Sequence, residues 1–216
     1  MKNKIIGAAV VFLYSTVLAF AALAETPIPD NPKKRIPQGK YVTAKEAYEK
    51  WSANPDGIKI IDCRTPEEYV FLGHPQMAMN IPGKLWIGEF DTKKGMPMLA
   101  ENPDFIPTVK KYFKPSDSIF VLCRSGDRSA ICAAWLDKEG FKNVHNIIDG
   151  FEGDLISDKD SYYNGKRMKN GWKNSGAPWT YDVDPNLAFF IHINREHAEK
   201  KHGKDNVLDV TAEVVA

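Results

Sequence analysis

The sequence predicts an α/β fold in which a parallel sheet has helices on its faces. Short apolar runs rich in β-branched residues alternate along the chain with segments that have helix caps and helical patterning. Such alternation is typical of consecutive βαβ units. The composition, with 43% hydrophobic and 26% charged residues among 216, is ordinary for a globular protein. It excludes a collagen-like, coiled-coil, disulfide-dense or wholly disordered chain.

The first half of this pattern predicts two helices and two strands. A helix is expected over 43–51, because Glu46 lies at the capping-box spacing from the threonine that begins it. Residues 58–61 form a short apolar run with the length of a buried strand. A short helix that begins at a proline follows over 66–71, and a strand over 79–81.

The second half continues the alternation. A helix is expected over 103–113 and an apolar strand over 119–122. The next helix, over 128–139, stops at Gly140, because glycine is common where helices end. Residues 144–148 form the last predicted strand, and no internal repeat is visible.

The first 24 residues have the pattern of a secretory signal peptide. Lys2 and Lys4 precede an apolar run over 5–23, and the small residues that end the run place cleavage after Ala24. We therefore expect an exported, periplasmic protein with no stable membrane anchor after cleavage of residues 1–24. An uncleaved anchor is the alternative, since the run approaches the length that spans a bilayer.

Both ends of the mature chain differ from its middle. Residues 25–38 contain four prolines and are expected to form an extended arm or linker, so that folding begins near residue 39. The segment 181–216 is expected to be a helical tail, with Asp184 and Pro185 capping a helix. That helix would include Phe189, Phe190, Ile191 and Ile193.

Charge and cysteine content limit the possible partners. The formal net charge is only +1, so the chain lacks the basic surface field that collects nucleic acid, and no nucleic-acid partner is expected. The three cysteines are an odd number and show no paired spacing, which leaves at least one thiol free even after export. Cys63 and Cys132 fall inside predicted elements and are expected to be core thiols.

The strongest local signal is a loop that joins the strand over 119–122 to the helix that follows it. The loop and first helical turn contain Cys123, Arg124, Ser125, Gly126, Asp127, Arg128 and Ser129. Backbone N–H groups and a helix N-terminus should surround the Cys123 sulfur, and two arginines favour its thiolate. Gly126 allows a tight turn, and it has no side chain to fill the bowl that these N–H groups form around the sulfur. The pattern predicts a nucleophilic cysteine in an anion-binding loop, although Asp127 would offset part of the positive charge.

Two ordered motifs resemble the rhodanese-like sulfurtransferases. The first reads Asp62-Cys63-Arg64-Thr65-Pro66-Glu67-Glu68-Tyr69, then Gly73-His74-Pro75, Ala78 and Asn80-Ile81-Pro82, and the second is the loop over 123–129. The resemblance covers about residues 39–180. It implies a doubly wound, mostly parallel sheet of about five strands, with the nucleophile at the carboxyl end of a central strand.

The resemblance also implies roles for individual residues. Cys123 would accept sulfur as a persulfide, Arg124 and Arg128 would bind the oxyanion, and backbone N–H groups over 124–129 would stabilise the persulfide. The substrate-binding residues would thus be Arg124, Ser125, Gly126, Asp127, Arg128 and Ser129. Three further residues would be structural: Asp62 would end a strand, and Arg64 would pair with Glu68. No metal or other cofactor is implied.

Two extra segments distinguish this chain from the family pattern. They cover about 83–102 and 151–171. Both begin where parallel strands end, which is the edge of the sheet where the catalytic loop should lie. We therefore expect the two insertions to wall or cover the site. The later one also has basic and aromatic residues that could receive an anionic donor or a partner protein.

The resulting hypothesis is sulfur transfer through Cys123, from thiosulfate, polysulfide or a related donor to a thiol or protein acceptor. A non-enzymatic carrier of sulfane sulfur for a partner protein is one alternative. A cysteine-dependent phosphatase or arsenate-handling enzyme is another. Four residues separate Cys123 from Arg128, whereas related cell-cycle phosphatases have five, and the tighter loop favours sulfur over phosphate.

Overall fold

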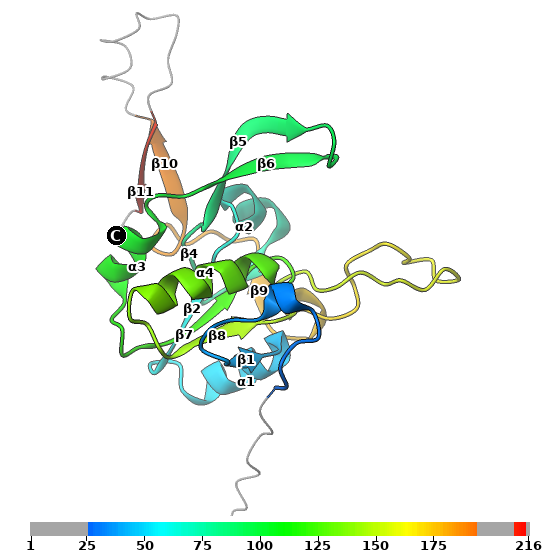
Figure 1. Ribbon diagram of the computed structural model, residues 1–216, viewed down its shortest axis with the longest axis horizontal. Coiled ribbons are helices and arrows are strands. Elements are labelled where there is room, and N and C mark those ends of the chain that lie inside the picture. The colour runs from blue at the N-terminus through cyan, green and yellow to red at the C-terminus, as the bar shows by residue number, and fades with distance from the viewer. Residues whose placement is uncertain (1–25, 194–209, 215–216) are drawn as a thin grey trace, which may run out of the picture.

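A five-stranded parallel sheet forms the centre of the protein, which was analysed as a computed structural model (Figure 1). The structure describes residues 26–193 and 210–214. In order across the sheet, the strands are β1 (Tyr41–Val42), β8 (Val144–Ile147), β7 (Ser118–Leu122), β2 (Ile58–Asp62) and β4 (Met79–Asn80). The predicted fold class is confirmed, and the central strand β7 ends directly before Cys123.

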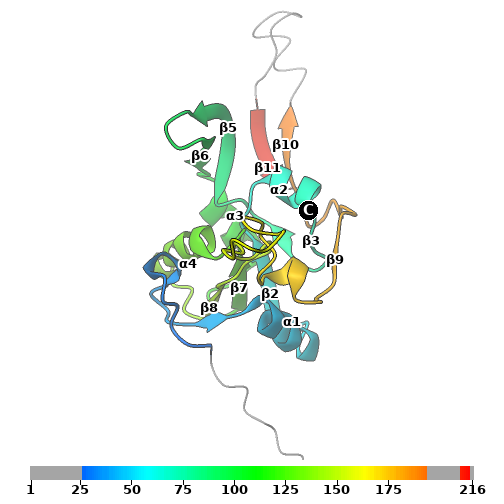
Figure 2. The same cartoon turned by 90° about the vertical axis from the view of Figure 1, so that its right-hand side faces the viewer.

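Helices cover both faces of this sheet. They are α1 (Ala44–Ala53), α2 (Pro66–Leu72), α3 (Phe105–Tyr112) and α4 (Asp127–Lys138). Along β7, Ile119 and Val121 belong to the core shared with α3 and α4, whereas Phe120 and Leu122 belong to the core shared with α1. Successive strand residues point to opposite faces, so a run that is apolar throughout is buried on both sides. Figure 2 shows α4 and α1 on opposite sides of the sheet.

Local sequence signals fix where the first two helices begin. Thr43 and Glu46 form the predicted capping box of α1. The same arrangement recurs at α2, where Thr65 accepts a hydrogen bond from the Glu68 N–H and the Glu68 carboxylate accepts one from the Thr65 N–H. Each box satisfies N–H groups that a helix start leaves without partners. Glu68 is therefore held in place before it makes any other contact.

The proline-rich arm packs on the domain rather than serving as a linker, so folding begins earlier than residue 39. It forms a short 3-10 helix, η1 (Pro32–Lys34), and buries Ile36 in the core. The Gln38 side chain donates to the Ala133 carbonyl of α4 over 2.9 Å. The prolines indicated an extended chain, but one apolar side chain and these polar contacts are enough to dock it.

The predicted insertion over 83–102 is a β-hairpin. Its strands, β5 (Lys84–Asp91) and β6 (Met96–Glu101), pair antiparallel and project from the end of the domain shown at the top of Figure 1. Buried Asn102 closes the base of the hairpin by donating from its side chain to the Pro82 carbonyl over 2.8 Å. The insertion over 151–171 is irregular, apart from one bridge between Leu155 and Arg167 and short turns.

Several small elements complete the described structure, and most of them belong to its last part. These are β3 (His74–Pro75) paired with β9 (Trp179–Thr180), the 3-10 helix η2 (Trp172–Asn174), and β10 (Phe189–Ile193) paired antiparallel with β11 (Val210–Val214). The helix predicted to include Phe189 to Ile193 is therefore wrong. Two β-branched isoleucines and two aromatic residues favour a strand once a partner strand is present.

Two predictions lie largely outside the described residues. The signal peptide over 1–24 is wholly outside them, as are positions 194–209 of the tail. Among the residues that are described, no helix is long and apolar enough to cross a membrane.

His145 provides a test of this packing. It lies in β8, with its ring centroid 4.7 Å from that of Phe120, and within the described residues its Nδ1 has no hydrogen-bond partner. Burial, followed by the charges of Lys40 and Lys50, lowers its pKa to about 4. The unfolded chain, with a pKa near ~6.5, binds a proton more readily. The stability that this difference contributes is present above pH ~6.5 and is lost as the pH falls towards 4.

We expect the free energy of unfolding to fall by on the order of 2 kcal/mol over this range because of His145, allowing for its partial exposure. Urea unfolding at pH 7 and pH 4.5 measures the fall. His145→Gln should show a smaller fall than the wild type. Equal falls in the two proteins would rule out the histidine as the source.

Candidate active site

Cys123 lies at the point where β7 becomes α4. Its side chain is only 1% exposed. The Gly126 N–H donates to Cys123 Sγ over 3.2 Å, and Ser129 Oγ is 3.4 Å from the same sulfur. Ser129 belongs to the first turn of α4, whose free N–H groups and partial positive charge also lie at this end of the helix. One backbone N–H of the predicted bowl thus reaches the Cys123 sulfur, which lies at the N-terminal end of α4.

Two glycines allow the loop to pack against the chain that follows β8. Gly126 has φ +100°, and a Cβ there would lie 2.2 Å from the Ile148 carbonyl oxygen. Gly150 has φ +62°, and a Cβ there would lie 2.4 Å from the Cys123 carbonyl oxygen. Any larger residue at either position would force the two backbones apart. The sequence predicted the need for glycine at the first position only.

Backbone hydrogen bonds hold the loop carbonyls on the side away from the sulfur. The Phe151 N–H donates to the Cys123 carbonyl over 2.8 Å, and the Glu152 N–H donates to the Arg124 carbonyl over 3.0 Å. Because these carbonyls are engaged behind the loop, N–H groups can face the bowl. The segment after β8 therefore holds the loop around Cys123 in place through its backbone. None of its side chains was predicted to do so.

Asn146 is a buried contributor that the sequence did not single out. Its Oδ1 accepts a hydrogen bond from Ser129 Oγ over 2.6 Å, and its Nδ2 donates to the Gly126 carbonyl over 3.0 Å and the Lys34 carbonyl over 2.8 Å. One amide thus joins the loop, the first turn of α4 and the N-terminal arm. An asparagine inside a buried strand is the signal that could have identified it, since such a group needs partners.

Arg128 is engaged by Glu68 in a two-point ion pair. Both guanidinium-to-carboxylate distances are 2.6 Å. Burial alone would raise the pKa of Glu68, but hydrogen bonds and charge from Arg128 lower it overall. The pair fixes α2 against α4. It also corrects the sequence interpretation, in which Glu68 was expected to pair with Arg64.

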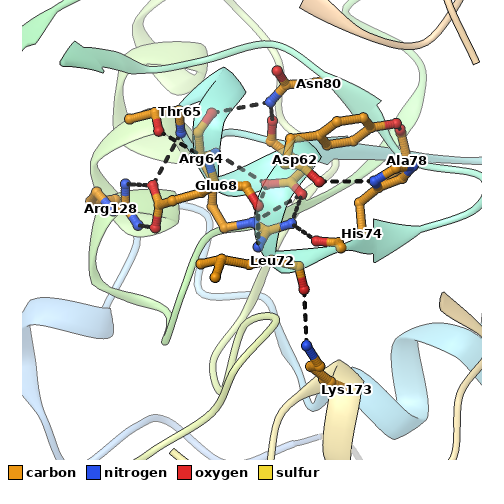
Figure 3. A network of polar contacts seen from close by, with 12 residues as sticks. Asp62, Arg64, Thr65, Glu68, Leu72, His74, Ala78, Asn80, Arg128 and Lys173 are labelled. Atoms are coloured by element: carbon orange, nitrogen blue, oxygen red, sulfur yellow. Dashed lines mark hydrogen bonds and ion pairs between the residues drawn. The ribbon is translucent and has the colours of Figure 1, made fainter. Parts of the chain in front are cut away.

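Arg64 is instead paired with Asp62, and both side chains are fully buried (Figure 3). Arg64 Nη2 donates to Asp62 Oδ2 over 2.6 Å and to the Gly73 carbonyl over 2.8 Å. The guanidinium carbon is also 4.2 Å from the centre of the Phe151 ring. The predicted end of a strand at Asp62 is confirmed. A buried arginine needs several partners for its charge and its N–H groups. Asp62, two residues away in the sequence, supplies the opposite charge.

The other two cysteines are buried core thiols, as predicted, and all three are free. Burial, followed by a hydrogen bond with Cys132, raises the pKa of the Cys63 thiol. Cys123 is buried to the same degree, and it differs from them in the backbone donor at its sulfur and in its place in the lining of the cavity described next.

A cavity of about 470 Å³ lies above the Cys123 loop. Its floor is formed by Cys123, Arg124, Ser125, Asp127 and Arg128, and α2 and the turn before it contribute Thr65, Glu67, Glu68 and Leu72. The remaining wall consists of Trp86, Met96, Pro97 and Leu99 from the hairpin, with Glu152 from the later insertion. The prediction that the first insertion walls the site is confirmed. From the later insertion, only Glu152 lines this cavity.

The predicted substrate-binding residues are brought together, but not in equivalent ways. Arg124 is exposed and Ser125 half-buried on the cavity floor. Gly126, through its N–H, and Ser129, through its hydroxyl, contact the Cys123 sulfur. Asp127 makes no side-chain cap for α4, and within the described residues its buried Oδ1 has no hydrogen-bond partner.

Residues 43–155, slightly more than half of the chain, match the family model described as Rhodanese-like domain. Among solved structures, that of Rv0390 from M. tuberculosis is similar, with a TM-score of 0.50 and 26% identity, covering 66% of this chain and all of that one. The residues that match the family model include β2, β4, β7 and β8 of the sheet and the cysteine loop.

Two plant proteins are similar over a shorter segment. Senescence-associated protein DIN1 of Raphanus sativus is 36% identical over 95 residues, which cover 44% of this chain and 47% of that protein. Thiosulfate sulfurtransferase 16, chloroplastic, of Arabidopsis thaliana is 36% identical over 95 residues, which cover 44% of this chain and 72% of that protein. This chain thus spans about half the length of the Raphanus protein.

The buried ion pair gives a stability prediction. Asp62→Ala leaves the Arg64 charge without its main partner in a site with no solvent access, so unfolding free energy should fall by about 3–5 kcal/mol. Asp62→Asn keeps the shape and should cost less. Urea unfolding followed by circular dichroism measures both.

The control is Asp137→Ala, which removes the partner of Lys142, a side chain that is 69% exposed. Exposed pairs contribute less than about 1 kcal/mol. Equal losses for the buried and exposed pairs would contradict the view that Asp62 neutralises Arg64.

Proposed function

Because this chain belongs to the rhodanese-like domain family, we propose that it transfers sulfane sulfur through a persulfide formed on Cys123. The observation that supports this most directly is the position of Cys123 Sγ. The sulfur lies at the floor of a cavity, where the Gly126 N–H and the Ser129 hydroxyl approach it. The sulfur thus has a backbone donor and also belongs to the lining of the cavity that a substrate would enter.

The first half-reaction loads sulfur onto the protein. The Cys123 thiolate attacks the outer sulfur of thiosulfate or another sulfane donor. The S–S bond of thiosulfate breaks, its electron pair leaves with sulfite, and a new S–S bond joins the outer sulfur to Cys123. Exposed Arg124 lies on the cavity floor and can attract an anionic donor. Arg128 contributes less free charge, since Glu68 already engages it.

The cradle then stabilises the loaded state. The outer persulfide sulfur bears negative charge, and the Gly126 N–H and the N-terminal end of α4 beside Cys123 favour that charge. Ser129 Oγ has one proton and two neighbours, Cys123 Sγ at 3.4 Å and Asn146 Oδ1 at 2.6 Å. The shorter contact favours donation to Asn146, so the Gly126 N–H is the donor that remains for the sulfur.

The second half-reaction unloads the sulfur. An acceptor thiolate attacks the outer persulfide sulfur, the Cys123 S–S bond breaks, and its electron pair returns to Cys123 as thiolate. The acceptor becomes a persulfide, so sulfur and electrons balance without an external oxidant. This order of events predicts ping-pong kinetics.

The test is the intact mass of the purified protein after incubation with thiosulfate. Wild-type protein should gain one sulfur, and cyanide should remove it. Cys123→Ser should gain none, because its hydroxyl cannot form a persulfide. Cys132→Ser serves as the matched control, since Cys132 is a buried core thiol, and it should load like the wild type.

Sulfur gain by Cys123→Ser would overturn the assignment of the nucleophile. Wild-type protein that gains no sulfur from thiosulfate or from polysulfide would overturn the proposed chemistry. Multiple turnovers with small thiols would separate an enzyme from a carrier that delivers only to a protein partner. Hydrolysis of an aryl phosphate, with Cys123 required, would instead support the phosphatase alternative.

We also propose that the protein is exported to the periplasm. The proposal rests on Lys2, Lys4, the apolar run over 5–23 and the small residues that precede Glu25. Expression of the full chain in a bacterial host tests it. The mature protein should appear in the periplasmic fraction with Glu25 as its first residue, and an intact chain in the membrane fraction would contradict cleavage.

A further inference from the structure

Transfer from a small inorganic donor explains only the floor of the cavity. The volume of about 470 Å³ falls in the range that holds small organic ligands. The whole hairpin wall, and most of the carboxylates around the cavity, have no role in the loading step. The acceptor thiol, the second substrate, is the molecule that would contact this wall and these carboxylates.

The hairpin gives the cavity an apolar wall. Trp86 is 51% exposed and Met96 is 43% exposed, and both line the cavity together with Pro97 and Leu99. Leu72 of α2 adds a further apolar side chain to the lining. Exposed apolar groups next to a nucleophile gain free energy when an apolar ligand covers them. A substrate with a hydrocarbon body fits this wall, and an inorganic sulfur anion does not.

The charge around the cavity is negative. Four carboxylates and two guanidinium groups line it. Glu68 and Arg128 neutralise one another, which leaves Glu67, Asp127 and Glu152 against Arg124. An acidic lining attracts a cation, and Arg124 beside Cys123 is the one lining group left to attract the anionic donor of the loading step.

These three carboxylates are also short of hydrogen-bond donors. One oxygen each of Glu67, Asp127 and Glu152 is buried and, within the described residues, has no hydrogen-bond partner. Buried acceptors without partners are unfavourable, so each of these carboxylates has a charge that no donor compensates and favours a cation nearby. A protonated amine has three N–H donors and a positive charge, and it satisfies both requirements together.

We propose that the acceptor is a small organic thiol with an apolar body and a protonated amine. The inference rests on the proposed persulfide chemistry. The apolar body packs on the hairpin wall near Trp86, and the amine is held by the carboxylates. The acceptor thiolate then reaches the outer sulfur of the Cys123 persulfide, breaks its S–S bond and leaves as an organic persulfide.

The experiment compares matched acceptors on protein that has already been loaded. Wild-type protein is loaded with thiosulfate, freed of donor, and checked for the added sulfur by intact mass. Loss of that sulfur is then timed with cysteine methyl ester, which is a cation, and with N-acetylcysteine methyl ester, which is neutral. N-acetylcysteine, which is an anion, completes the series. Ratios between wild type and variants cancel the different reactivities of these thiols.

The variants remove one carboxylate at a time. In Glu67→Gln and in Glu152→Gln, the ratio of cation to neutral rates should fall by about 5-fold from that of the wild type. The charge-matched control is Glu89→Gln, on the same hairpin but outside the cavity lining. Its ratio should match that of the wild type. High salt should lower the wild-type ratio, because the attraction is electrostatic.

The apolar wall has its own comparison. Trp86→Ala should slow transfer to cysteine benzyl ester by about 10-fold relative to cysteine methyl ester, because the larger body loses its packing surface. Circular dichroism verifies that each variant is folded. An unchanged ratio would show that Trp86 does not contact the substrate and would remove the apolar body from the proposal.

The outcomes separate this inference from the proposed function. If no sulfur loads onto Cys123, the persulfide chemistry and the acceptor class both fail. If sulfur loads and transfers, but neither Glu67→Gln nor Glu152→Gln changes the ratio of cation to neutral rates, only the acceptor class fails. A ratio of N-acetylcysteine to neutral rates that neither variant raises above that of the wild type would likewise overturn it.

Discussion

Close backbone contact between the cysteine loop and the segment after β8 is the constraint on which the site depends. The Cys123 and Arg124 carbonyls accept hydrogen bonds from residues 151 and 152, so these carbonyls cannot turn towards the sulfur. Gly126 and Gly150 make the approach possible, since a Cβ at either would lie within 2.4 Å of a carbonyl oxygen. The donor that reaches the Cys123 sulfur, the Gly126 N–H, is thus supplied by the backbone and depends on this close approach.

The two ion pairs place the elements around this bowl rather than supply charge to it. Glu68 completes the capping box of α2 and at the same time binds Arg128 of α4. The position of α2 relative to the loop is therefore fixed by one carboxylate with two local functions. The ion pair between Asp62 and Arg64 likewise fixes the end of β2, and both of its side chains are fully buried. Because both arginines are neutralised by partners, the electrostatics of the cavity are set by the residues without partners.

The sequence was sufficient for features that depend on neighbouring residues. The cysteine loop, the capping box at Thr43 and the buried strand over 119–122 are all local patterns, and the structure contains each of them. Features that depend on residues far apart in the chain were not predictable in the same way. Glu68 pairs with a residue sixty positions away, and the strand at Phe189–Ile193 exists because β11 pairs with it. The secondary-structure propensity of a residue does not indicate which distant residue or strand it will contact.

Chemistry and recognition are thus located in different parts of the chain. The cysteine loop belongs to the sheet core, and its geometry is over-determined by glycines, backbone hydrogen bonds and Asn146. The hairpin is attached to the sheet edge at Asn102 and contributes only side chains to the cavity. Its residues can therefore change without disturbing the nucleophile, whereas those of the loop cannot. On the proposed function, a scaffold divided in this way would keep one sulfur chemistry while the hairpin and the nearby carboxylates determine which thiol receives the sulfur.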